Sequence, residues 1–246
     1  MAVNTVMDAT PGLPGSPGSS GSCPTRCEAF PAPLDAAART ATWTAAWALL
    51  DCAAPAWLLA ELEQAWGEPQ RHYHDRRHLG ECLALWTHWR AHCERPGEVA
   101  VALWFHDAVY DPRADDNELR SAAWAARSLG AAGVGSAVAQ RVHELVMATR
   151  HGAPTGEGSA DGGDADVLLD IDLAILGSPA ERFERYDRDV RLEYADVPLR
   201  TYTRRRREVL QGLAARAPLY RGAAAVELLG PQAHVNLAAA LSRLQQ

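Results

Sequence analysis

The sequence predicts an all-α fold built around one hydrophobic core. Alanine, leucine, arginine and tryptophan recur at intervals of three and four residues through most of the chain, and runs with the alternation of strands are almost absent. The chain has 246 residues, of which 48% are hydrophobic, so it is long enough to bury one good-sized core. We therefore expect one compact domain of mainly antiparallel helices over residues 35–246.

The N-terminal segment differs in composition from the rest of the chain. Residues 8–33 are rich in proline, glycine and serine, which cannot form a packed core, so we predict a disordered extension over residues 1–34. The N-terminus has no basic region followed by an apolar stretch, so we expect no signal peptide. The chain has no run of about 18 apolar residues, so we expect no membrane span. The five cysteines are an odd number without paired-ligand spacing, and a chain of this size does not need disulfides, so we expect a reducing cytoplasm.

Apolar spacing and capping residues predict the helices of the first half. Leu79, Leu83 and Trp86 form an apolar stripe at helical spacing. Asp115 is placed to cap a later helix, with Glu118 folding back onto its amide. The expected helices cover residues 35–50, 55–66, 73–95, 98–108, 115–130 and 136–150.

The second half begins with a loop and continues as helices. Residues 152–164 are rich in glycine, aspartate and serine and are expected to form a mobile loop or a lid. A break is expected at Gly230-Pro231, because proline inside a helix lacks the backbone donor and clashes with the preceding turn. The expected helices cover residues 166–176, 179–194, 198–215 and 223–244.

The charge composition excludes several classes of function. The net charge of -7 disfavours duplex nucleic acid as a partner. All 24 basic residues are arginine, which excludes a Schiff-base lysine and the lysine of a phosphate-binding P-loop. The abundance of alanine, glycine and proline is typical of a GC-rich bacterial genome.

One His-Asp pair stands where an apolar segment ends. His106 and Asp107 follow the apolar residues 99–105, and burying two ionisable groups at the edge of a core is costly unless something binds them. A hydrogen-bonded pair at the edge of the core is the simpler alternative for such a dipeptide alone. A His from the upstream segment 71–78 and an Asp from the downstream segment 169–173 could complete a site for one metal with nitrogen and oxygen ligands. Such a site suits Mn²⁺, Fe²⁺, Co²⁺, Ni²⁺ or Zn²⁺ better than Ca²⁺, and Mg²⁺ is a further candidate.

Four segments resemble the HD superfamily of metal-dependent phosphohydrolases, and within it a bacterial branch of predicted hydrolases. They are residues 73–78, 104–111, 116–118 and 170–177, and the similarity extends over about residues 40–240. The resemblance implies a compact HD-domain-like helical bundle with four metal ligands: His78, His106, Asp107 and Asp172. It also implies that the metal activates a water and polarises a phosphoryl oxygen, with Asp107 orienting that water.

Other polar residues are weaker candidates for the site. His74 could contact substrate or a second metal, or support the start of a helix; Glu118 could donate a proton, or only cap its helix. Arg150 and His151 close a helix beside the predicted loop and could meet a phosphate, although cationic residues there also complement the helix dipole. Arg191 is a further candidate substrate contact.

The sequence therefore predicts a cytoplasmic phosphohydrolase that acts on a small phosphorylated metabolite, with a nucleotide as the first choice. Two residues depart from the family. Some HD nucleotidases have a catalytic glutamate at the position of Tyr110, and relatives in this branch tend to have arginine at the position of His234. One rival is a di-iron oxygenase, which would recruit His143 and His151 as ligands. A second rival is a non-catalytic nucleotide-sensing module, against which the intact ligand set argues.

Overall fold

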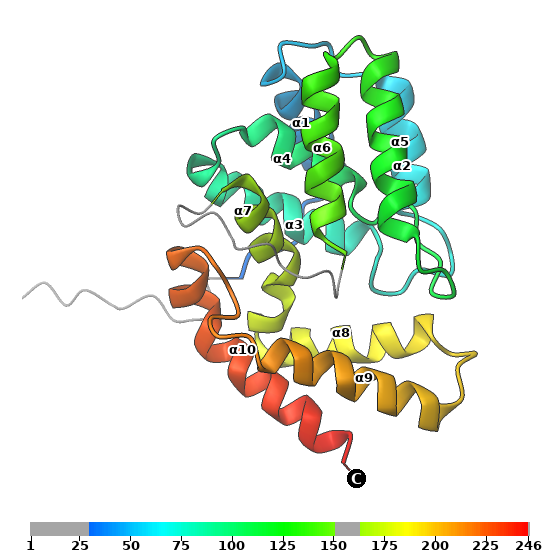
Figure 1. Cartoon of the computed structure of the whole chain (residues 1–246), viewed down its shortest axis with the longest axis vertical. Helices are drawn as coiled ribbons and strands as arrows, with labels where there is room; N and C mark the ends of the chain where they lie inside the picture. Colours follow the sequence, from blue (N-terminus) through cyan, green and yellow to red (C-terminus); the bar gives the residue numbers. More distant parts are fainter. Residues whose placement is uncertain (1–29, 151–162, 246) are drawn as a thin grey trace, which may run out of the picture.

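The computed structural model describes residues 30–150 and 163–245, and over these residues the predicted all-α fold is confirmed (Figure 1). Residues 1–29 of the predicted extension and residues 152–162 of the predicted loop lie outside the described residues. Residues 30–34 pack against the domain: Leu34 N donates to Gly80 O at 3.1 Å. No helix in the described part of the chain is long and apolar enough to cross a membrane.

The first half of the chain forms a cluster of helices around one buried helix. Its elements are α1 (Ala36–Ala48), α2 (Ala56–Ala65), α3 (Arg76–Trp89), η2 (Arg90–His92), α4 (Pro96–Phe105), α5 (Asn117–Ala131) and α6 (Ser136–Ala148). Every residue of α4 after Pro96 is buried, which is typical of a helix that is apolar on all sides. Helices α1, α3, α5, α6 and α7 all pack against α4. The residues that follow Phe105 therefore emerge at the edge of the core.

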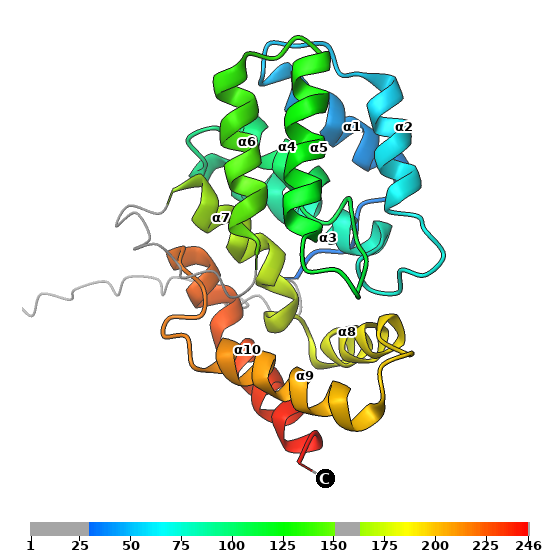
Figure 2. The same ribbon diagram turned by 45° about the vertical axis from the view of Figure 1, so that its right-hand side comes forward.

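The second half forms a lower layer of helices that is joined to the first by α7. Its elements are α7 (Asp164–Asp172), η3 (Leu173–Gly177), α8 (Ala180–Glu193), α9 (Leu199–Ala214) and α10 (Ala223–Arg243). Figures 1 and 2 show α8, α9 and α10 below the first cluster, with α7 and η3 reaching between the two layers. The end of α7 thus lies beside α3 and α4, and both of these helices pack against it.

The predicted break in the last helix is wrong. Helix α10 runs unbroken from Ala223 to Arg243 with Pro231 inside it. Buried residues on both sides of the proline, Leu229 before it and Ala233 after it, fix the helix to its neighbours. The Asn236 side chain adds hydrogen bonds to the carbonyls of Leu176 and Ser178, each at 2.8 Å. These contacts offset the roughly 3 kcal/mol that an interior proline costs.

Gly177 allows the closest approach between η3 and α10. A Cβ at this position would lie 2.6 Å from Leu229 Cβ and 2.7 Å from Leu229 O, and the backbone carbonyl cannot move without displacing α10. We expect Gly177→Ala to lower the free energy of unfolding by about 1–3 kcal/mol in urea denaturation. The control is Gly212→Ala, whose Cβ would meet nothing within 4 Å on α9 and which should be neutral or stabilising. An unchanged urea midpoint for Gly177→Ala would contradict the close approach.

Candidate metal centre

Three separate parts of the chain carry the residues of the site. His78 lies in the first turn of α3, which begins at Arg76 after the Asp75 side chain caps it. His106 is the C-cap residue of α4, Asp107 follows directly, and Asp172 is the last residue of α7. Because α3 begins at Arg76, later than predicted, His74 precedes the helix and does not share its face.

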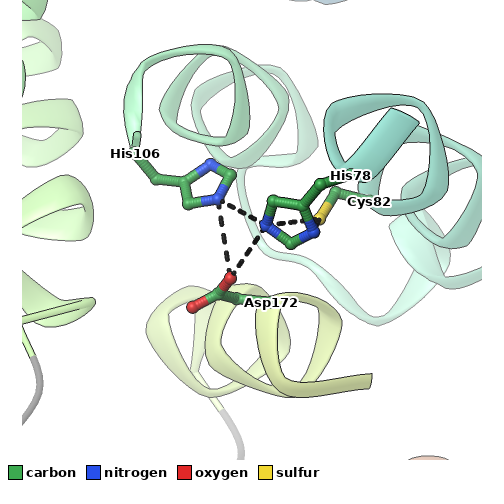
Figure 3. A group of neighbouring side chains, drawn as sticks. All are labelled: His78, Cys82, His106 and Asp172. Atoms are coloured by element: carbon green, nitrogen blue, oxygen red, sulfur yellow. Dashed lines mark hydrogen bonds and ion pairs between the residues drawn. The ribbon is translucent and has the colours of Figure 1, made fainter. Parts of the chain in front are cut away.

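The structure brings all four predicted metal ligands together. His78 Nε2 lies 3.1 Å from His106 Nε2, and Asp172 Oδ1 lies 3.3 Å and 3.5 Å from these two nitrogens, respectively (Figure 3). Asp107 Oδ2 is 3.3 Å from His106 Nε2 and 4.0 Å from His78 Nε2. Two imidazole nitrogens and two carboxylate oxygens therefore face one another, and this donor set fits a divalent metal.

Hydrogen bonding and charge orient the His106 ring for this role. His106 Nδ1 lies 2.7 Å from the carbonyl oxygen of Leu103, so a proton on Nδ1 leaves Nε2 with its lone pair directed at the cluster. Burial alone would lower the pKa of His106, but Asp107 and Asp172 raise it well above its usual value. Burial alone would likewise raise the pKa of Asp172, but His106 and His78 hold it well below its usual value. The cluster thus favours a positive charge between its carboxylates, as a bound cation would supply.

Cys82 is a neighbour of the cluster that the sequence analysis did not assign. His78, Cys82, His106 and Asp172 offer ligand atoms within 4.8 Å of one another, a group that could hold a metal ion. However, Cys82 Sγ lies 3.7 Å from Nδ1 and 3.8 Å from Nε2 of His78. These nearly equal distances place the sulfur beside the ring, off the lone-pair direction of Nε2. Burial raises the pKa of Cys82 well above its usual value. Asp107 is not part of this group, although its Oδ2 faces His106 Nε2 at 3.3 Å.

The buried side chain of Arg71 holds the backbone at the cluster. Its guanidinium donates to Asp107 O at 2.6 Å, to Ala108 O at 2.9 Å and to His74 O at 3.1 Å, and its side chain is fully buried. The segment before α3 and the segment after α4 are thereby joined. Sequence reasoning missed this role because no local pattern distinguishes Arg71 from the other arginines.

Glu193, at the end of α8, binds the segment that precedes α3. Glu193 Oε1 accepts hydrogen bonds from the backbone amides of His72, Tyr73 and His74 at 2.9, 2.8 and 2.9 Å, respectively. Its Oε2 lies 2.7 Å from His74 Nδ1 and accepts from the Tyr110 hydroxyl at 3.0 Å. Sequence reasoning gave Glu193 no role, since it lies 119 residues from His74.

The Glu193 contacts predict a specific loss of stability in acid. Burial alone would raise the pKa of Glu193, but His74 and the backbone amides lower it to about 2. Because the pKa is lower in the folded state, the stabilisation is present above the unfolded pKa of about 4.5 and is lost as the pH falls towards 2. We expect Glu193→Gln to cost on the order of 3 kcal/mol at neutral pH and progressively less in acid. Urea denaturation of both proteins from about pH 2 to pH 7 measures the difference, and a difference that stays constant with pH would contradict the assignment.

In the described part of the chain, no hydrogen bond joins Asp170 or Glu118 to the cluster. Asp170, two residues before Asp172 on α7, points to another side of the helix and accepts hydrogen bonds from the amides of Arg221 and Gly222, just before α10. The predicted capping box at Asp115 is wrong: α5 begins at Asn117 with Asp116 as its N-cap and without a side-chain cap. The Asn117 side chain instead bonds the backbone of Asp111. No hydrogen bond or ion pair between described residues joins Glu118 to the cluster.

The arginines predicted to contact phosphate, and the histidines predicted as alternative iron ligands, are not joined to the cluster by any hydrogen bond or ion pair between described residues. Arg191 donates to the carbonyls of Tyr194 and Val197 and lies over the Tyr202 ring, so it holds the turn between α8 and α9. Arg150 is exposed after α6, and His151 falls outside the described residues. His143 is half-buried on α6 and is not part of the possible metal group found among the described residues.

No protein-family model, curated protein or solved structure matches this chain. The fold and the cluster define an all-α protein with a buried group of histidine, cysteine and aspartate side chains that could hold a metal ion.

Proposed function

We propose that this chain is an HD-type metal-dependent phosphohydrolase that cleaves a phosphate ester of a small metabolite, with a nucleotide as the first substrate class to test. The observation that carries the proposal is the convergence of His78, His106, Asp107 and Asp172 from three separate elements. These residues have the types and the order that the resemblance to the HD superfamily implies. The choice of a nucleotide rests on that resemblance alone.

The four side chains divide into two buried nitrogens and two partly open carboxylates. The His78 and His106 side chains are 3% and 1% exposed, whereas those of Asp107 and Asp172 are 19% and 11% exposed. A substrate therefore approaches from the side of the carboxylates. A divalent ion held here would lower the pKa of a coordinated water and polarise a phosphoryl oxygen. Asp107 is the most open of the four, and its carboxylate can accept a hydrogen bond from the attacking water.

The experiment is a measurement of phosphate release from a panel of nucleotides and sugar phosphates. Mn²⁺, Co²⁺, Ni²⁺ or Mg²⁺ is added in turn to the wild type and to Asp107→Ala. We expect release that requires a metal and is lost in the variant. The matched control is Asp196→Ala, because that side chain is 79% exposed.

Two outcomes would overturn the proposal. Bound metal without phosphate release from any substrate would exclude phosphate-ester chemistry for this panel and favour a nucleotide sensor. Two irons per chain with consumption of O₂ would favour the oxygenase.

We further propose a cytoplasmic location, since Cys52, Cys82 and Cys93 are free thiols in the described part of the chain.

A further inference from the structure

Beside the cluster lies a second polar group whose members bind one another. Glu193 uses both carboxylate oxygens, one for three backbone amides and one for His74 and Tyr110. The Glu193 side chain has no exposed surface, whereas that of His74 is 21% exposed. Glu193 therefore cannot reach a ligand itself, but His74 can.

The His74 ring lies between the cluster and Tyr110. Its centroid is 4.1 Å from that of the stacked Tyr110 ring and 6.1 Å from that of His78. Nδ1 is bound to Glu193, and Nε2 has no hydrogen-bond partner among the described residues. The ring thus has one nitrogen committed to the fold and one without a role in it.

The arginines near the cluster are committed to other groups. Arg71 gives its donors to backbone carbonyls and to Glu68. Arg182 binds Glu81 through two contacts of 2.6 Å, and its remaining nitrogen, Nη1, is buried without a hydrogen-bond partner among the described residues. A buried carboxylate against Nδ1 stabilises the positively charged form of an imidazole, whose Nε2–H is then a donor suited to a phosphate oxygen.

We propose that His74 Nε2 donates a hydrogen bond to the phosphate group of the substrate, and that Glu193 is the positioning residue that holds the His74 ring in place. The inference rests on the proposed phosphohydrolase function and adds a residue for substrate recognition outside the metal ligands. Glu193 acts on the substrate only through His74, because its own oxygens are buried and fully used.

The test is the affinity of the Mg²⁺- or Mn²⁺-loaded protein for inorganic phosphate, measured by calorimetry for His74→Gln and Glu193→Gln. A charge-assisted hydrogen bond predicts that both variants bind phosphate about 10- to 100-fold more weakly than the wild type. Their affinity for the metal should stay within about threefold. His72→Gln is the matched control, since the exposed His72 side chain is not part of these contacts, and it should bind phosphate like the wild type.

A second readout separates positioning from general damage to the fold. In long-range ¹H–¹⁵N spectra of the Mg²⁺-loaded wild type, phosphate should shift the Nε2 resonance of His74 more than its Nδ1 resonance. Glu193→Asp, which keeps the carboxylate, should recover part of the affinity that Glu193→Gln loses. Where turnover has been found, a rise in KM larger than the fall in kcat is expected for both glutamine variants.

The failure of this inference is distinguishable from the failure of the proposed function. Unchanged phosphate affinity in a folded His74→Gln protein that still binds metal would overturn the inference and leave the phosphohydrolase in place. Absence of phosphate binding in the metal-loaded wild type would also overturn it. Loss of metal affinity in His74→Gln would mean that His74 supports the metal site and not the substrate.

Discussion

Replacing His106 with alanine should abolish metal binding and with it any metal-dependent activity. His106 Nε2 lies within 3.5 Å of one nitrogen and two carboxylate oxygens of the other ligands, so it stands at the centre of the cluster. Loss of a residue that only hydrogen-bonds to a metal ligand lowers metal affinity roughly 10–100-fold, and we expect a larger fall here because His106 is itself a proposed ligand. The measurement is the metal content of the purified protein after dialysis against micromolar Mn²⁺ or Zn²⁺.

Cys82→Ala is the control for this first prediction. The Cys82 sulfur lies beside the His78 ring and not on the line of its Nε2 lone pair, so its removal should leave one metal per chain. Retention of one metal by His106→Ala, together with its loss from Cys82→Ala, would contradict the proposed ligand set.

Replacing Arg71 with leucine should have the largest effect on stability. The change leaves the carbonyls of Asp107, Ala108 and His74 without their buried donor. An unsatisfied buried group costs about 1–3 kcal/mol, so we expect a loss of about 3–5 kcal/mol in the free energy of unfolding, measured in urea. Metal affinity should fall as well, because the backbone of Asp107 is released.

Two further variants interpret the Arg71 result. Arg71→Lys should be intermediate, since a single ammonium group cannot reproduce the planar fork that bonds neighbouring carbonyls. Arg120→Leu, at a side chain that is 52% exposed, should change the stability by less than about 0.5 kcal/mol. A loss below about 1 kcal/mol in Arg71→Leu would mean that water replaces the guanidinium and that the segment is not held as described.

The part of this structure that depends on local pattern could be predicted from sequence. Apolar spacing is retained along each helix, and an apolar run such as residues 99–105 can only be buried, which placed His106 and Asp107 at the edge of the core. Helix geometry likewise places Asp170 and Asp172 on different sides of α7, in agreement with their contacts, whereas the choice of Asp172 as the ligand comes from the family resemblance. The unbroken α10 was missed because tertiary contacts outweigh the intrinsic cost of Pro231.

The residues that support the cluster could not be predicted, because their roles arise only from tertiary contacts. Glu193 meets a segment 119 residues away, and Arg71 contacts carbonyls 36 and 37 residues away. A carboxylate at the end of a helix and an arginine in a polar segment have many possible partners. Only Cys82, four residues after His78 on α3, left a sequence signal that could have been read.

The most direct test of the metal centre is X-ray absorption at the zinc edge of the protein loaded with one equivalent of Zn²⁺. The ligand set His78, His106, Asp107 and Asp172 predicts a shell of nitrogen and oxygen only, at about 2.0–2.2 Å, with the outer scattering of two imidazoles. A sulfur shell at about 2.3 Å would show that Cys82 is a ligand. A spectrum without imidazole scattering would contradict a metal centre at this cluster.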